Sequence, residues 1–141
     1  EFMDILQCRI SSQLKPEDID YITVNHVELD HAGALPRMIE LCKPEAVLCS
    51  PMGKKAIETH FKGWENWPIR VVKSGDSISI GKRTIHFLET RMLHWPDSMC
   101  SYVPEDRILF TNDAFGQNLA TSGRYSDQVD PAALEHAMRE Y

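Results

Sequence analysis

Residues 21–33 of the chain read YITVNHVELDHAG. The segment opens with Tyr21 to Val24, whose aromatic and β-branched side chains predict a short buried strand. Directly after this strand come four side chains that can bind a metal ion: His26, Glu28, Asp30 and His31. Alternate residues of an extended segment share one face, so we expect the first three of these side chains to converge. The small pair Ala32-Gly33 then lets the backbone turn tightly behind them.

This cluster has two interpretations. Any one of its residues, taken alone, is more often a solvated side chain on a surface loop. Four of them within six residues, between an apolar strand and a predicted helix, favour a metal site instead. The end of a strand is also where α/β proteins commonly place functional groups.

Outward from this segment the chain alternates strands and helices and then changes to hairpins. The predicted elements are a helix over 2–14, a helix over 35–41, a strand over 46–49, a helix over 53–61, a strand over 69–72, hairpins over 77–88 and 101–110, and a closing helix over 131–141 with Asp130 as its N-cap. This order is typical of a layered α/β (α+β) domain.

Composition restricts the class of protein. The 141 residues are 43% hydrophobic, which suits one soluble domain with a real core. The net charge of −6, without a basic run, argues against a nucleic-acid partner. No segment approaches the roughly 18 apolar residues of a membrane span, and the first residues do not resemble a secretory signal. We therefore expect a cytoplasmic protein with no membrane partner, whose four cysteines are free thiols.

Two later residues are further candidate ligands. His94 lies in a loop crowded with apolar and rigid residues, and Asp113 directly follows the predicted strand 108–110. A structural histidine and a turn-capping aspartate are the alternatives, so both assignments depend on the upstream cluster. Trp95 is expected to line the metal pocket. Asp97 and Ser98 do not form a hydrolase triad, because the chain has no Gly-x-Ser-x-Gly turn.

The ligand types indicate which metal would bind. The six candidates comprise three histidines and three carboxylates, with no thiolate. Such a set suits iron or manganese as well as zinc. Three carboxylates offset much of the charge of two ions, and one of them could bridge ions about 3.5–4 Å apart. Glu28, where a further imidazole might have stood, favours iron.

The candidate ligands also resemble a known pattern. The metallo-β-lactamase superfamily carries His-x-His-x-Asp-His, followed by a distant histidine and a distant aspartate. Here the order is His26-x-Glu28-x-Asp30-His31, then His94 and Asp113. Glutamate stands at the second position of this pattern, as in the flavodiiron proteins. The sequence segments 24–26, 33–36, 93–99 and 110–117 also match that family, so most of the chain is similar to the flavodiiron proteins.

This resemblance implies a metallo-β-lactamase-like αββα sandwich that holds two iron ions. Residues 1–141 would form part of that domain, incomplete in this chain. At matching positions, His26, Glu28 and His94 would hold one iron, Asp30 and His31 the other, and Asp113 would bridge them. The family's last ligand is a histidine further downstream. It has no counterpart here, because His136 is too early.

The resemblance also implies a function. Flavodiiron proteins reduce O2 to water, NO to N2O, or both, with electrons from an FMN on a flavodoxin-like domain that follows in the same polypeptide. We thus expect a fragment of such a reductase, with a donor such as rubredoxin and a head-to-tail homodimer. The alternatives are a zinc-dependent hydrolase on the same fold and a non-catalytic diiron oxygen sensor.

Overall fold

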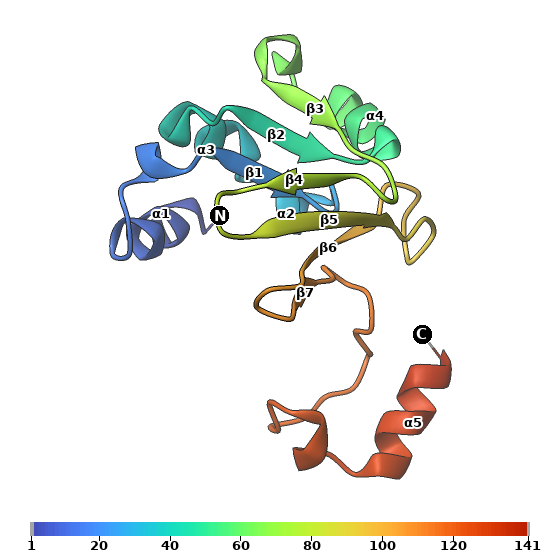
Figure 1. Ribbon diagram of the computed structural model, residues 1–141. Coiled ribbons are helices and arrows are strands. Elements are labelled where there is room, and N and C mark those ends of the chain that lie inside the picture. Colours follow the sequence, from blue (N-terminus) through green and yellow to red (C-terminus); the bar gives the residue numbers. More distant parts are fainter. Residues whose placement is uncertain (1, 141) are drawn as a thin grey trace.

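The computed structural model describes residues 2–140, which form two sheets and a set of helices (Figure 1). The parallel sheet has the order β1-β2-β3, with β1 at Tyr21–Val24, β2 at Ala46–Cys49 and β3 at Ile69–Val71. The antiparallel sheet has the order β4-β5-β6-β7, with β4 at Ser77–Ser79, β5 at Thr84–Glu89, β6 at Met99–Val103 and β7 at Ile108–Phe110. The α-helices are α1 (Met3–Ser11), α2 (Leu29–Ala32), α3 (Leu35–Cys42), α4 (Pro51–His60) and α5 (Pro131–Glu140).

The parallel sheet follows from the strand–helix alternation. Parallel strands cannot be joined by a tight hairpin, and α2 and α3 supply the crossover between β1 and β2. The register runs from Tyr21 opposite Ala46 to Val24 opposite Cys49. The carboxyl ends of β1 and β2 therefore lie at the same edge of the sheet, with the predicted metal cluster just beyond β1.

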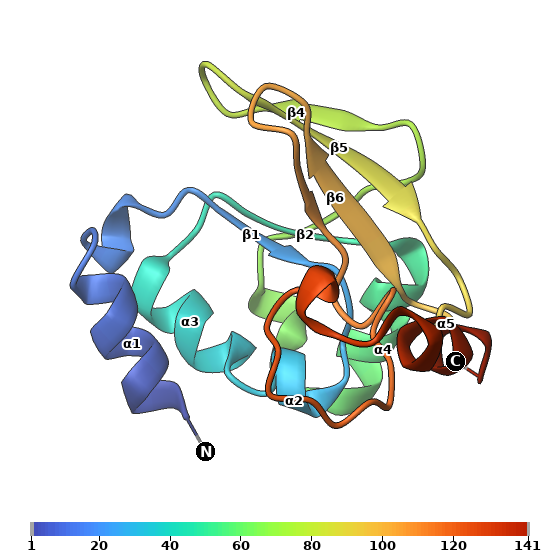
Figure 2. The same cartoon turned by 90° about the horizontal axis from the view of Figure 1, so that it is seen from below.

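Strand β2 is buried along its whole length and separates two parts of the core. Val47 and Cys49 pack on the helix side, in a cluster that includes Ile57 of α4. Leu48 packs on the other side, in a cluster that includes Phe87 of β5. Helices α1 to α4, the parallel sheet and the antiparallel sheet are therefore stacked in that order, as Figure 2 shows from below, while α5 lies apart from the other helices (Figure 1). This is the helix–sheet–sheet part of the expected sandwich, and the predicted fold class is confirmed.

The element boundaries differ slightly from the prediction. Helix α4 begins at Pro51 and not at 53, because the Ser50 side chain caps it by accepting the Gly53 N–H at 2.8 Å. Helix α1 ends at Ser11, earlier than the expected residue 14. Asp130 does cap α5, accepting the Ala133 N–H at 3.2 Å. That helix was predicted to reach Tyr141, which lies outside the described residues.

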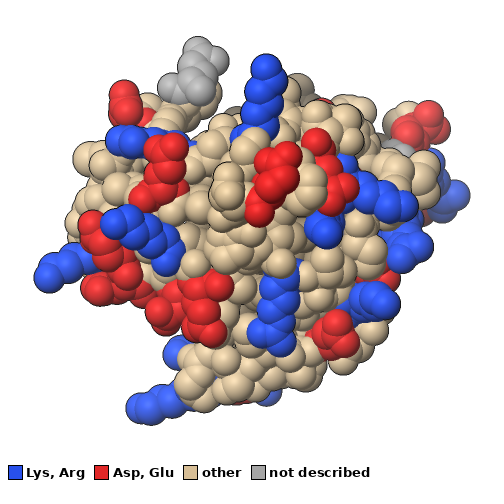
Figure 3. Space-filling view, turned by 90° about the horizontal axis from the view of Figure 1, so that it is seen from above, with Lys and Arg blue, Asp and Glu red and all other residues tan. Residues whose placement is uncertain are grey.

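The surface carries charges of both signs. On the face drawn in Figure 3, acidic and basic side chains are interspersed. Within residues 2–140, no helix is long and apolar enough to cross a membrane. The four cysteines are free thiols, as predicted. Cys8 is exposed and Cys49 is buried, and burial raises the pKa of the Cys49 thiol to about 12.

Replacing Leu48 tests the position of the core. Leu48 is fully buried between the two sheets, so Leu48→Ala should leave a cavity and lower the free energy of unfolding by about 2–5 kcal/mol. Leu88→Ala is the matched control, since Leu88 is 57% exposed on β5 and should change stability by less than about 0.5 kcal/mol. If urea denaturation showed the same loss in free energy of unfolding for both variants, this packing would be contradicted.

Candidate metal centre

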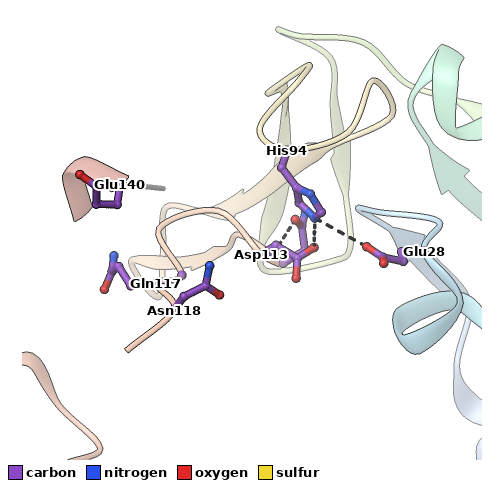
Figure 4. A pocket seen from close by; sticks show the side chains of 8 residues that line it. Glu28, His94, Asp113, Gln117, Asn118 and Glu140 are labelled. Carbon is purple, nitrogen blue, oxygen red and sulfur yellow. Dashed lines mark hydrogen bonds and ion pairs between the residues drawn. The ribbon is translucent and has the colours of Figure 1, made fainter. Parts of the chain in front are cut away.

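Four candidate ligands meet at one end of the two sheets, three of them labelled in Figure 4. His26 and Glu28 follow β1, His94 lies in the loop between β5 and β6, and Asp113 follows β7. One donor atom from each of the four side chains lies within 4.8 Å of all the others. The fold thus gathers residues from distant parts of the chain into one compact cluster.

The spacing of these donor atoms suits a metal ion. The Nε2 atom of His26 lies 3.2 Å from Glu28 Oε2 and 3.5 Å from Asp113 Oδ2. The Nε2 atom of His94 lies 3.6 Å from each of the same two oxygens. Ligand atoms about 2.1 Å from one tetrahedral ion lie about 3.4 Å from one another. The residues present therefore fit a metal ion both in their chemistry and in their separations.

The hydrogen bonding of His26 points to the same conclusion. Its Nδ1 lies 3.2 and 3.1 Å from the two carboxylate oxygens of Asp97. A carboxylate accepts hydrogen bonds, so Nδ1 carries the proton and, in the neutral ring, Nε2 presents a lone pair. That lone pair faces oxygens of Glu28 and Asp113, which are acceptors as well. Acceptor groups that converge in this way are stabilised by a cation between them.

Asp113 connects two groups of candidate ligands. Its Oδ2 faces the histidines at 26 and 94, while its Oδ1 lies 2.9 Å from Nε2 of His31. The same His31 nitrogen lies 3.6 Å from Asp30 Oδ2. One carboxylate with an oxygen directed at each group has the arrangement of a bridging ligand.

The predicted convergence of three alternate residues is wrong for Asp30. His26 and Glu28 do point into the cluster, but Glu28 is the N-cap of α2, and the extended backbone ends there. Asp30 lies within the helix, and its side chain is 69% exposed at the edge of the site. The tight turn predicted at Gly33 is confirmed, because a Cβ atom there would clash with a backbone carbonyl oxygen of α2.

One residue that contacts the site was missed by the sequence analysis. Asp97 was considered only as part of a hydrolase triad, whereas its buried carboxylate lies behind His26. The signal that could have found it is general, since a ligating histidine usually donates its other ring N–H to a carboxylate or carbonyl. The loop that carries His94 also carries Asp97. Trp95, between them, stands edge-on to His26 with ring centroids 5.1 Å apart, in agreement with its predicted place at the pocket.

Two asparagines fix the loops that carry the ligands. The Asn25 side chain donates to the Phe110 carbonyl at 3.1 Å and accepts from the Ser101 hydroxyl at 2.7 Å. Asn112 has a φ of 53°, a left-handed conformation that asparagine tolerates better than most residues. Its side chain donates to the Met99 carbonyl at 2.9 Å. The residues just before His26 and Asp113 are thereby tied to the antiparallel sheet.

An open and largely polar cavity of about 700 Å³ lies over the cluster. Its walls include Glu28, His94 and Asp113, together with Gln117 and Asn118. Figure 4 shows the two amide side chains lying away from the ligands, toward α5. A small molecule can therefore reach the candidate ligands from this side.

The layer order and the histidine–carboxylate cluster at the sheet ends define a metallo-β-lactamase-like domain. A family model described as "ODP family beta lactamase" matches residues 1–139. The chain belongs to this family.

Relatives of known name match over nearly the whole chain. It is 53% identical over 141 residues to the rubredoxin-oxygen oxidoreductase of Megalodesulfovibrio gigas, covering all of this chain and 35% of that protein. It is 43% identical over 140 residues to the nitric oxide reductase of Moorella thermoacetica, covering 99% of this chain and 35% of that protein. The chain thus spans about a third of the length of these relatives.

Solved structures show the same similarity as the sequences of the relatives. The rubredoxin oxygen:oxidoreductase from Desulfovibrio gigas has a TM-score of 0.85 at 53% identity, over 99% of this chain and 34% of that one. The flavodiiron protein from Giardia intestinalis has a TM-score of 0.83 at 35% identity, again over 99% and 34%. The resemblance to flavodiiron proteins expected from the sequence is confirmed.

Substitutions at Asn112 separate its backbone and side-chain roles. Asn112→Gly removes the side-chain hydrogen bonds but suits the left-handed backbone, so it should lower the free energy of unfolding by about 1 kcal/mol. Asn112→Ala also strains the backbone and should cost about 1–2 kcal/mol more. Thermal or urea unfolding measures both. An alanine variant as stable as the glycine variant would contradict the left-handed conformation.

Proposed function

We propose that this chain forms the diiron-binding part of a reductase that converts O2 to water, NO to N2O, or both. The observation that carries the proposal is the donor set, in which Glu28 and Asp113 face His26 and His94. Mixed imidazole and carboxylate ligands suit iron. Related proteins that match the whole chain are named as an oxygen oxidoreductase and a nitric oxide reductase, which supports both substrates.

Each candidate ligand has a proposed place. His26, Glu28 and His94 would hold one iron, Asp30 and His31 would contribute to the other, and Asp113 would bridge the pair. A histidine from outside residues 1–141 would complete the second site. When bound, the two irons supply electrons to the gas and stabilise, as Lewis acids, the charge that develops on it.

The chain's own residues control access and orientation around these ligands. The cavity over Glu28 and His94 leaves an open approach for a diatomic gas. The amide side chains of Gln117 and Asn118 line the same cavity but lie away from the ligands, toward α5 (Figure 4), and so leave the approach clear. On the opposite side, the Trp95 ring packs against His26 and keeps water away from the buried face of the ligand.

We further propose that residues 1–141 are part of one metallo-β-lactamase-like domain that a flavodoxin-like FMN domain follows in the complete polypeptide. Relatives named flavodiiron protein and rubredoxin-oxygen oxidoreductase support the flavin and a rubredoxin-type electron donor. A cytoplasmic head-to-tail homodimer would bring the FMN of one protomer to the irons of the other. The 141-residue chain alone would then lack the electron supply and be inactive.

Metal analysis and gas consumption test this proposal. The complete polypeptide, purified with its flavin, should contain about two irons per chain and should consume O2 or NO when its FMN is reduced. A zinc-loaded protein that hydrolyses a phosphodiester or thioester and consumes no gas would contradict the proposal in favour of a hydrolase. Gas binding without turnover would favour a sensor.

Glu28→His tests why the site prefers iron. This change restores the histidine of the general His-x-His-x-Asp-His pattern and removes one negative charge, so the ratio of bound iron to bound zinc should fall several-fold. Glu40→His is the matched control, since Glu40 is exposed on α3 and should leave the ratio unchanged. An unchanged ratio in Glu28→His would show that this position does not select the metal.

A further inference from the structure

Asp97 is a buried carboxylate in the loop between β5 and β6. It is 3% exposed and is not one of the clustered candidate ligands. Its Oδ2 accepts the backbone N–H of Val27 at 2.7 Å and lies 3.1 Å from Nδ1 of His26. Its own backbone carbonyl accepts the Ser50 hydroxyl at 2.8 Å. Segments that follow β1 and β2 thus meet at this one residue.

The Asp97 carboxylate requires donors on all sides. Burying a charged group is costly unless hydrogen bonds compensate for lost water. The Val27 N–H supplies one donor, and the imidazole N–H of His26 supplies the other. A carboxylate offers only acceptor atoms, so His26 can satisfy it only with a proton on Nδ1. The other ring nitrogen, Nε2, is then the one directed at Glu28 and Asp113.

The ring of His26 is also held in place by its neighbours. Trp95 stands edge-on to it, at 84° between the ring planes and 5.1 Å between centroids. The rings of His31 and His94 each lie 5.4 Å from it. With these three rings around it and Nδ1 directed at Asp97, the ring presents Nε2 in one direction.

We propose that Asp97 is a positioning residue that sets the tautomer of His26 and aims its Nε2 at the metal ion. This inference rests on the proposed metal centre. Asp97 acts through His26 and touches neither metal nor substrate. It also links the ligand position to the parallel sheet through Val27 and Ser50.

Asp97→Asn separates positioning from packing, because asparagine has almost the same shape. Its amide oxygen can keep the Val27 N–H bond, which leaves the NH2 group facing Nδ1 of His26. An NH2 donor favours the opposite tautomer, with the proton on Nε2, where the metal should bind. The affinity for Zn²⁺, used alone as a diamagnetic probe, should fall by about 10–100-fold.

Two matched controls accompany this variant in the complete polypeptide. Ser50→Ala removes the hydrogen bond to the backbone carbonyl of Asp97, together with the side-chain N-cap of α4, and leaves the Asp97 carboxylate in place. Asp76→Asn makes the same chemical change in an exposed turn, where Asp76 accepts the Lys73 N–H. Both controls should bind Zn²⁺ within about 3-fold of wild type.

Nuclear magnetic resonance of ¹⁵N-histidine in the Zn²⁺-loaded wild type gives a readout that needs no variant. His26 should show a protonated Nδ1 and a metal-bound Nε2, and Asp97→Asn should lose the Nδ1–H signal. Coordination through Nδ1 in the wild type would overturn the proposal. So would equal losses of affinity in Asp97→Asn and Ser50→Ala, which would mark Asp97 as merely structural.

Metal binding by the wild type distinguishes failure of the metal centre from failure of the role of Asp97. A wild type that binds neither zinc nor iron would overturn the metal centre, and the role of Asp97 with it. A wild type that binds metal as tightly as Asp97→Asn would overturn the role of Asp97 alone.

Discussion

Asn25 joins the two sheets one residue before the first candidate ligand. Its backbone carbonyl accepts the Met99 N–H at 2.9 Å, and its side chain bonds to Phe110 and Ser101. The end of β1 in the parallel sheet is thereby fixed against β6 and β7 of the antiparallel sheet. This junction helps to hold the segments that carry His26 and Asp113 next to each other, although these residues lie 87 positions apart in the sequence.

The site built on this junction brings together groups of like charge that would otherwise repel one another. Glu28 and Asp113 bring two carboxylates to the same place, opposite the Nε2 atoms of two histidines. Packed sheets impose this convergence, and the buried Asp97 behind His26 directs the ring into it. A metal ion is the species that would compensate for such an arrangement, and mixed imidazole and carboxylate donors suit iron.

The sequence was sufficient for the larger features. The strands at 21–24 and 46–49 and the hairpins follow from local apolar patterns, whereas the layer order was implied by the resemblance to flavodiiron proteins. Four of the six proposed ligands do meet in one cluster. The place of Asp30 could not be predicted, because a helix begins at Leu29 where alternation suggested extended backbone. Asp97 was missed for a different reason: its partner lies 71 positions away, and only the packing of the two sheets brings them together.

The central claim is that His26, Glu28, His94 and Asp113 hold one of two iron ions. The most direct measurement is anomalous X-ray diffraction at the iron edge on crystals of the complete, iron-loaded polypeptide. We predict two iron peaks about 3.5–4 Å apart. One should lie within about 2.2 Å of a donor atom from each of these four side chains, with Asp113 between both peaks. A single peak, or iron bound elsewhere in the protein, would contradict the account.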